Sequence, residues 1–137
     1  MPIQQILTDE DYQRLADFRH ALRRFLFFSE QAAASEDLTP QQYQAMLAIR
    51  GSSVGPPNLA TLADRLCLKH NTVVELVQRL EKSKLIHKRP CPDDGRAVVL
   101  GLTKEGLKRL DRLAASHTAE LKNIGPEILK RLAKISS

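Results

Sequence analysis

The chain has 137 residues, of which 42% are hydrophobic and 27% are charged, which is typical of one globular domain and excludes a disordered tail. No apolar run approaches the roughly 18 residues of a membrane span, and residues 1–5 lack the basic start of a signal peptide. Two cysteines are too few for a disulfide scaffold. We therefore expect a cytoplasmic protein that has no membrane partner.

The charge is basic and unevenly distributed along the chain. The formal net charge is +5, with −2 in residues 1–50, +3 in residues 51–103 and +4 in residues 104–137. A basic middle and C-terminal region favours a polyanionic partner such as nucleic acid. From charge alone, an ordinary solvated basic surface is an equally good interpretation.

The first 50 residues predict two helices. Thr8 can cap the first, which begins with three acidic residues and continues at helical spacing to about residue 33. Thr39 and Pro40 begin the second, with Gln42 placed for a capping box, and Gly51 ends it. Its predicted buried stripe consists of Tyr43, Met46, Leu47 and Ile49.

The following segment predicts two closely spaced helices and a hairpin. A short helix begins at Asn58, and a second runs from about His70 to Lys84. The apolar period then changes from 3.6 to 2, which predicts strands over residues 86–91 and 98–102. The turn between them contains Gly95, which is free to take positive φ.

The C-terminal region predicts two more helices. Thr103 can cap the first, and Gly125-Pro126 is expected to separate it from the last. The predicted fold is therefore mainly α with a small β-hairpin wing, a winged helix-turn-helix flanked by N- and C-terminal helices.

The sequence predicts one domain over residues 1–137, with two functional parts. The winged helix-turn-helix covers about residues 40–103, and residues 1–38 and 104–137 supply helices with apolar stripes outside it. A second copy of the chain would bury those stripes in a two-fold interface, so we interpret them as dimerisation helices. Folding back onto the winged part of the same chain is the alternative.

The second helix of the pair is the candidate DNA reader. With its apolar residues facing the core, its other side presents polar groups that can bond to base edges or phosphates in a major groove. We expect Asn71, Thr72 and Glu75 to contact bases and Lys69, Arg79 and Lys82 to contact phosphates, with His70 at the start of the helix. The alternative is a solvated helical face.

The hairpin tip adds a second contact. Arg96 can reach into the electronegative minor groove beside the helix, and Asp94 can orient it through an ion pair. An ordinary charged turn is the alternative.

Several short sequence motifs follow one another between residues 62 and 103. Residues 62–66 (LADRL), 71–82 (NTVVELVQRLEK) and 84–86 (KLI) are followed by DGR at 94–96 and LGLT at 100–103. This order resembles the helix-turn-helix and wing of MarR-family transcriptional regulators over about residues 38–110.

The resemblance implies a homodimer on a pseudo-palindromic site in double-stranded DNA, repressing nearby genes until a small aromatic or phenolic effector loosens it. It also implies that Arg96 is the minor-groove arginine and Asp94 its orienting partner. Glu75 departs from the basic residue that many relatives carry in the middle of the reading helix. The base preference of relatives therefore does not transfer.

Other chemistry has less support in the sequence. Cys67 and His70 have the local spacing of a zinc site, as do His87 and Cys91, but an intervening helix of about 20 Å separates the two pairs. Cys67 beside basic residues is a candidate redox thiol, against the alternative of a small buried cysteine.

No nucleophile elbow, phosphate-cradling glycine loop or metal-binding His-Glu motif is present, so we expect neither an enzyme nor a bound cofactor. A winged-helix module that binds proteins without DNA is the alternative function.

Overall fold

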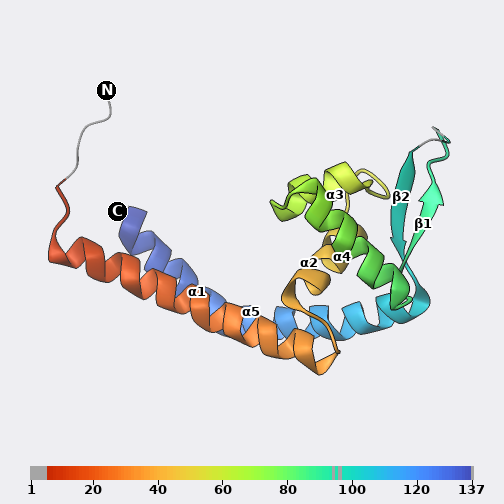
Figure 1. The fold of residues 1–137 in the computed structure, drawn as a ribbon. Helices are drawn as coiled ribbons and strands as arrows, with labels where there is room; N and C mark the ends of the chain where they lie inside the picture. The colour runs from red at the N-terminus through yellow and green to blue at the C-terminus, as the bar shows by residue number, and fades with distance from the viewer. Residues whose placement is uncertain (1–5, 94, 96, 137) are drawn as a thin grey trace.

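The computed structural model describes residues 6–93, 95 and 97–136. Within them the chain forms five helices and a two-stranded hairpin, as the sequence predicts except at one helix break. Helices α1 (Asp9–Ser35) and α5 (Lys104–Ser136) lie side by side and antiparallel and form a long arm (Figure 1). Arg24 of α1 donates to the carboxylate of Glu127 in α5 at 3.1 Å.

Hydrogen bonds at both ends define α1. The hydroxyl of Thr8 accepts from the backbone N–H of Asp11, and the Asp11 carboxylate accepts from the backbone N–H of Thr8. This backbone hydrogen bond lowers the pKa of the Asp11 carboxyl. At the other end, the Glu36 carboxylate accepts from Arg112 of α5 at 2.7 Å, which lowers the pKa of Glu36. The start of α1 is therefore determined locally, and its end is held by the neighbouring helix.

The predicted break at Gly125-Pro126 is wrong, because α5 continues through Pro126. Proline removes one backbone donor from a helix and crowds the preceding turn, so it usually marks an end. Here Ile124 is buried on the turn before Pro126, and Glu127 directly after it pairs with α1. Packing against α1 therefore outweighs the local cost of the proline.

The remaining elements form a compact head at one end of the arm (Figure 1). They are α2 (Pro40–Arg50), α3 (Leu59–Leu66), α4 (His70–Lys82), β1 (Ile86–Pro90) and β2 (Val98–Leu102). Their core contains Met46, Leu62, Val73, Val77, Leu80, Leu85 and Leu100, together with Leu110 and Leu113 of α5. The head and the start of α5 therefore share one core.

The predicted apolar stripe of α2 is correct at three of its four positions. Tyr43, Met46 and Ile49 are buried, but Leu47 is 43% exposed. Leu47 lies one position beyond Met46 on the helix, so its side chain turns away from the core.

The hairpin is antiparallel, with Ile86 opposite Leu102 and Pro90 opposite Val98. On the other edge of β2, the backbone N–H of Leu100 donates to the carbonyl oxygen of Pro57 at 2.9 Å. The loop before α3 is therefore tied to the wing.

A close backbone contact joins the arm to the head. The hydroxyl of Thr103 donates to the carbonyl oxygen of Lys84 at 2.7 Å and accepts from the N–H of Gly106, as expected for a helix cap. The backbone N–H of Thr103 also donates to the carbonyl oxygen of Leu85 at 3.1 Å. A Cβ at position 106 would collide with that same backbone, so glycine permits the approach.

We predict that Gly106→Ala destabilises the protein by about 1–3 kcal/mol, because the added methyl group meets fixed backbone. Gly125→Ala is the matched control on the same helix, since nothing lies within 4 Å of its Cβ position. This control should be neutral or stabilising by up to about 1 kcal/mol. Urea unfolding followed by circular dichroism, at one fixed protein concentration, measures both changes. Equal stability of the two variants would contradict the close contact at Gly106.

Candidate nucleic-acid interface

A tight turn sets α4 against α3. Cys67 takes a left-handed conformation with φ of 54°, and its backbone N–H donates to the carbonyl oxygens of the last turn of α3. The N–H of Leu68 donates to the carbonyl oxygen of Ala63 at 3.0 Å. Val73 and Val77 then bury one side of α4 in the core. The opposite side of α4 is therefore directed outward by the helix pairing.

The structure places the sequence-predicted residues of α4 together on this outward side. Six of them are exposed: Lys69, His70, Asn71, Glu75, Arg79 and Lys82. Thr72 is half-buried. Gln78, which lies between Glu75 and Arg79 in the sequence, is exposed as well. These polar residues extend along the whole length of α4.

The first turn of α4 has unused hydrogen-bonding capacity. Lys69 occupies the N-cap position but makes no side-chain cap. The side-chain oxygen of Asn71 accepts from the backbone N–H of Thr72 at 3.1 Å, and the two amide N–H groups of the same side chain are donors that this hydrogen bond does not use. Backbone N–H groups at a helix start favour anions such as phosphate oxygens.

The sequence did not reveal that the start of α2 borders this face. A groove of about 320 Å³ lies between the two helices and is lined by Thr39, Pro40, Gln41, Gln42, Thr72, Glu75, Leu76 and Arg79. Gln42 is engaged in the α2 cap, whereas Gln41 is exposed beside the groove. Thirty residues separate the two walls along the chain, so no local pattern could have indicated the contact.

The wing lies beside α4 and carries further basic residues. Lys88 and Arg89 of β1 are both exposed, and the ammonium group of Lys88 lies 3.6 Å from the carboxylate of Glu81 at the end of α4. The basic composition of β1 was the available signal for these residues. Asp94 and Arg96, predicted at the tip of the hairpin, lie outside the described residues.

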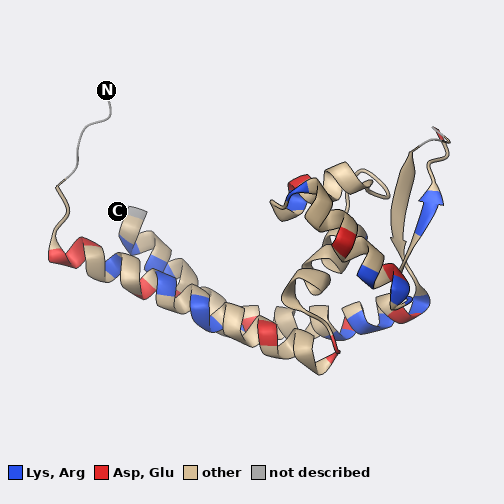
Figure 2. Cartoon of the chain, viewed as in Figure 1, with Lys and Arg blue, Asp and Glu red and all other residues tan. Residues whose placement is uncertain are grey.

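Basic and acidic side chains alternate over this surface. Figure 2 shows Lys and Arg towards the end of α4 and along β1, interrupted by acidic positions. Glu75 is the acidic residue in the middle of the exposed face of α4. A carboxylate at this position repels phosphate but can accept a hydrogen bond from cytosine N4.

The remaining sequence candidates lie elsewhere. Cys67 is exposed in the turn between α3 and α4, so the alternative of a buried cysteine is wrong, and its redox role stays a prediction. In the described part of the chain no cluster of His, Cys, Asp and Glu could hold a metal ion. None of the helices in that part combines the length and apolar character needed to cross a bilayer.

A buried histidine links the arm to the head. Nδ1 of His117 in α5 donates to the carbonyl oxygen of Leu113 at 2.7 Å, so Nε2 can accept from the hydroxyl of Ser29 in α1 at 2.8 Å. The ring of Tyr43 in α2 stacks on the imidazole with centroids 4.3 Å apart. Burial raises the pKa of the Tyr43 phenol. Three helices therefore converge on His117.

Residues 38–98, which include α2, α3, α4 and β1, match the model of the MarR family. This chain belongs to the MarR family. The MarR-family chain is 30% identical to the transcriptional repressor NicR of Pseudomonas putida over 95 residues, which cover 69% of this chain and 59% of NicR. It therefore spans little more than half of that relative's length.

The solved structures extend the likeness of fold to the arm. AbsC, a MarR-family regulator from Streptomyces coelicolor, superposes with a TM-score of 0.78 at 21% identity, over 96% of this chain and 92% of AbsC. A variant of S. aureus MepR bound to an oligodeoxyribonucleotide superposes with a TM-score of 0.68 at 20% identity. The superposition covers 95% of this chain and 96% of the MepR chain. The arm and the head of this MarR-family chain thus share the arrangement of these structures.

Proposed function

We propose that this MarR-family protein is a sequence-specific regulator of transcription that binds double-stranded DNA as a homodimer and represses nearby genes. The observation that carries the proposal is the exposed polar face of α4, flanked by the start of α2 and by the basic strand β1. An α-helix fits the major groove, and its exposed polar side chains can reach base edges there. NicR, to which this chain is 30% identical, is a transcriptional repressor, and this supports repression rather than activation.

Each part of the surface has its own role in this proposal. Asn71, Thr72 and Glu75, with His70, face base edges from the first half of α4. Lys69, Arg79 and Lys82 contact phosphates, and the basic strand β1 extends these contacts along the backbone. Arg96, oriented by Asp94, reads the adjacent minor groove.

A second copy of the chain would complete the arm. Leu129 is 68% exposed and Phe27 is 59% exposed, and Leu121, Leu132 and Ile135 add further exposed apolar surface on α5. Exposed apolar surface of this kind indicates an interaction site. A two-fold dimer formed there would place two α4 helices at half-sites about 34 Å apart.

The membership of a family of non-enzymatic regulators disfavours catalysis. A protein-interaction module without DNA binding is the competing proposal, because an exposed polar helix can also face a protein. Binding to an arbitrary DNA duplex at low salt distinguishes the two proposals. A DNA-binding protein should bind such a duplex, and a protein-interaction module should not.

We predict that Arg79→Ala lowers the affinity for duplex DNA at least tenfold (about 1.4 kcal/mol) for all sequences and reduces the slope of log K against log salt by about 1 per lost contact. Fluorescence anisotropy with a labelled duplex at several salt concentrations measures both quantities. Arg23→Ala on α1, which also removes an exposed arginine, should leave them unchanged. An unchanged salt slope in the Arg79 variant would remove this residue from the interface.

We predict that Glu75→Ala alters the preferred bases more than the non-specific affinity. A hydrogen bond to one base contributes about 1–3 kcal/mol of discrimination, whereas removal of a carboxylate weakens repulsion from every phosphate equally. Selection of binding sites from a random duplex library, run in parallel on the parent and the variant, measures the preference. The same consensus from both proteins would show that Glu75 does not read bases.

We predict that Leu129→Glu converts the dimer to a monomer, because it places a charge in the proposed apolar interface. Analytical ultracentrifugation measures the mass. Val54→Glu is the matched control, since Val54 is 85% exposed but lies in the head. A parent protein that sediments as a monomer at micromolar concentration would overturn the proposed dimer, while its DNA affinity would still be tested by the preceding experiments.

A further inference from the structure

The outward side of α4 has a centre and two flanks. At about 100° per residue, Gln78 lies within about 20° of Asn71 and about 160° from the buried Leu80. Glu75 lies about 60° from Gln78 on the same outward side. Arg79 lies about 100° from Gln78, on the flank that lines the groove beside α2. Gln78 is therefore at the centre of the outward side, one turn beyond Glu75.

The chemistry of the centre differs from that of its surroundings. The centre carries two neutral amides and one carboxylate, on Asn71, Gln78 and Glu75. The cations of this face lie at the two ends of α4 or on the flank towards α2: Lys69, Lys82 and Arg79. Phosphates attract cations and repel carboxylates, whereas base edges present donors and acceptors that amides and carboxylates match. The centre therefore suits base edges, and its surroundings suit phosphates.

The side chain of Gln78 has its full hydrogen-bonding capacity available. It is exposed, and within the described part of the chain its amide group makes no hydrogen bond. An open hollow of about 330 Å³ lies beside it and is lined by Glu75, Gln78, Arg79 and Lys82. The amide presents one acceptor and two donors on this side of the helix. A ligand that covers the face therefore meets the Gln78 amide directly.

We propose that Gln78 reads adenine in the major groove, as a further base-contacting side chain beside Asn71 and Glu75. This inference rests on the proposed function, because it requires α4 to lie in the groove. A glutamine side chain pairs with adenine through two hydrogen bonds, since its amide N–H donates to N7 and its oxygen accepts from the N6 amino group. Among the four bases, only adenine presents this acceptor and donor together in the major groove.

The spacing along α4 relates this adenine to the base that Glu75 contacts. Gln78 lies three residues after Glu75, which is about 4.5 Å further along the helix axis. Successive base pairs of a duplex are about 3.4 Å apart. The adenine read by Gln78 should therefore lie about one to two base pairs from the cytosine read by Glu75 in each half-site.

Selection of binding sites from a random duplex library, with the parent and each variant in parallel, tests the assignment. Gln78→Ala should reduce the preference for adenine at one position of each half-site by at least about fivefold and leave the other positions unchanged. Gln78→Glu should replace adenine by cytosine at that position, because a carboxylate accepts from cytosine N4 and has no donor for N7. A residue that only supported the fold would not change the identity of the selected base.

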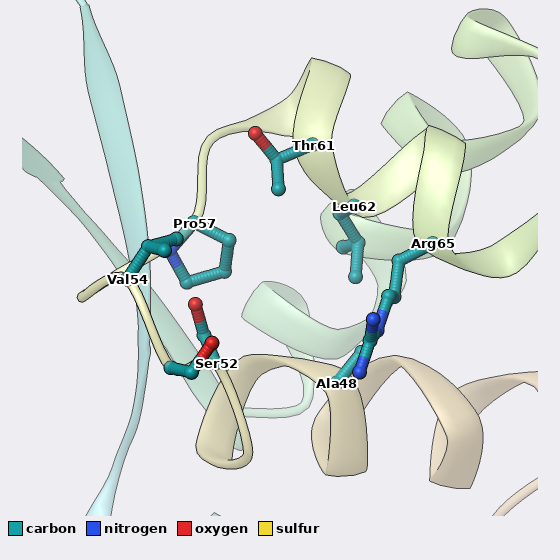
Figure 3. Close-up of a pocket in the computed structure, with 8 residues that line it drawn as sticks. Ala48, Ser52, Val54, Pro57, Thr61, Leu62 and Arg65 are labelled. Atoms are coloured by element: carbon teal, nitrogen blue, oxygen red, sulfur yellow. The ribbon is translucent and has the colours of Figure 1, made fainter.

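Thr61→Ala on α3 is the control variant. Thr61 is also an exposed polar residue of the head, but it lines a separate hollow formed by α2, α3 and the loop between them. Figure 3 shows Thr61 and Arg65 of α3 around this hollow. The control should return the consensus of the parent. Thermal unfolding checks that each variant is folded.

Three results would overturn the role of Gln78. They are the parent's consensus from Gln78→Ala, the same adenine from Gln78→Glu, and a relaxed position more than about two base pairs from the one that Glu75→Ala relaxes. In each case the parent still binds DNA, so the proposed function stands. A parent protein that binds no duplex at low salt would instead overturn the proposed function, and the role of Gln78 with it.

Discussion

The structure depends on a backbone contact between the start of α5 and the segment that follows α4. Thr103 bonds to the carbonyl oxygens of Lys84 and Leu85, and Gly106 permits the approach because it has no side chain. α4 is joined to this segment directly, so the arm sets the orientation of α4. In the proposed dimer, a rigid connection of this kind would hold the two α4 helices at the spacing of their half-sites.

A second connection runs through buried side chains rather than backbone. His117 of α5 bonds to Ser29 of α1 and stacks on Tyr43 of α2. α2 also forms one wall of the groove beside α4. A displacement of α2 would therefore be transmitted to both the arm and the polar face.

In the proposed DNA complex, the charge pattern of the polar face would separate affinity from selectivity. Lys69, Arg79 and Lys82 would attract the phosphates of any sequence. Glu75 at the centre of the face would oppose that attraction, so its presence there is costly unless it distinguishes bases. The basic strand β1 would compensate for this cost from a neighbouring element.

The sequence by itself determined the features that arise within a few residues. Thr8, Thr39 and Asn58 cap their helices through hydrogen bonds to the residue three positions later, and the apolar period placed the outward side of α4 correctly. The motifs around α4 also sufficed to indicate the family. These features could be predicted because both partners of each interaction lie on one short segment.

Tertiary structure alone decided the rest. The helix α5 continues through Pro126 because α1 packs against it. Leu47 is exposed although the helical spacing of apolar residues predicts that it is buried. The start of α2 contacts α4 although thirty residues of chain separate them. Each of these outcomes depends on surfaces brought together by folding, and the energy of burying them exceeds the local preferences that a sequence pattern expresses.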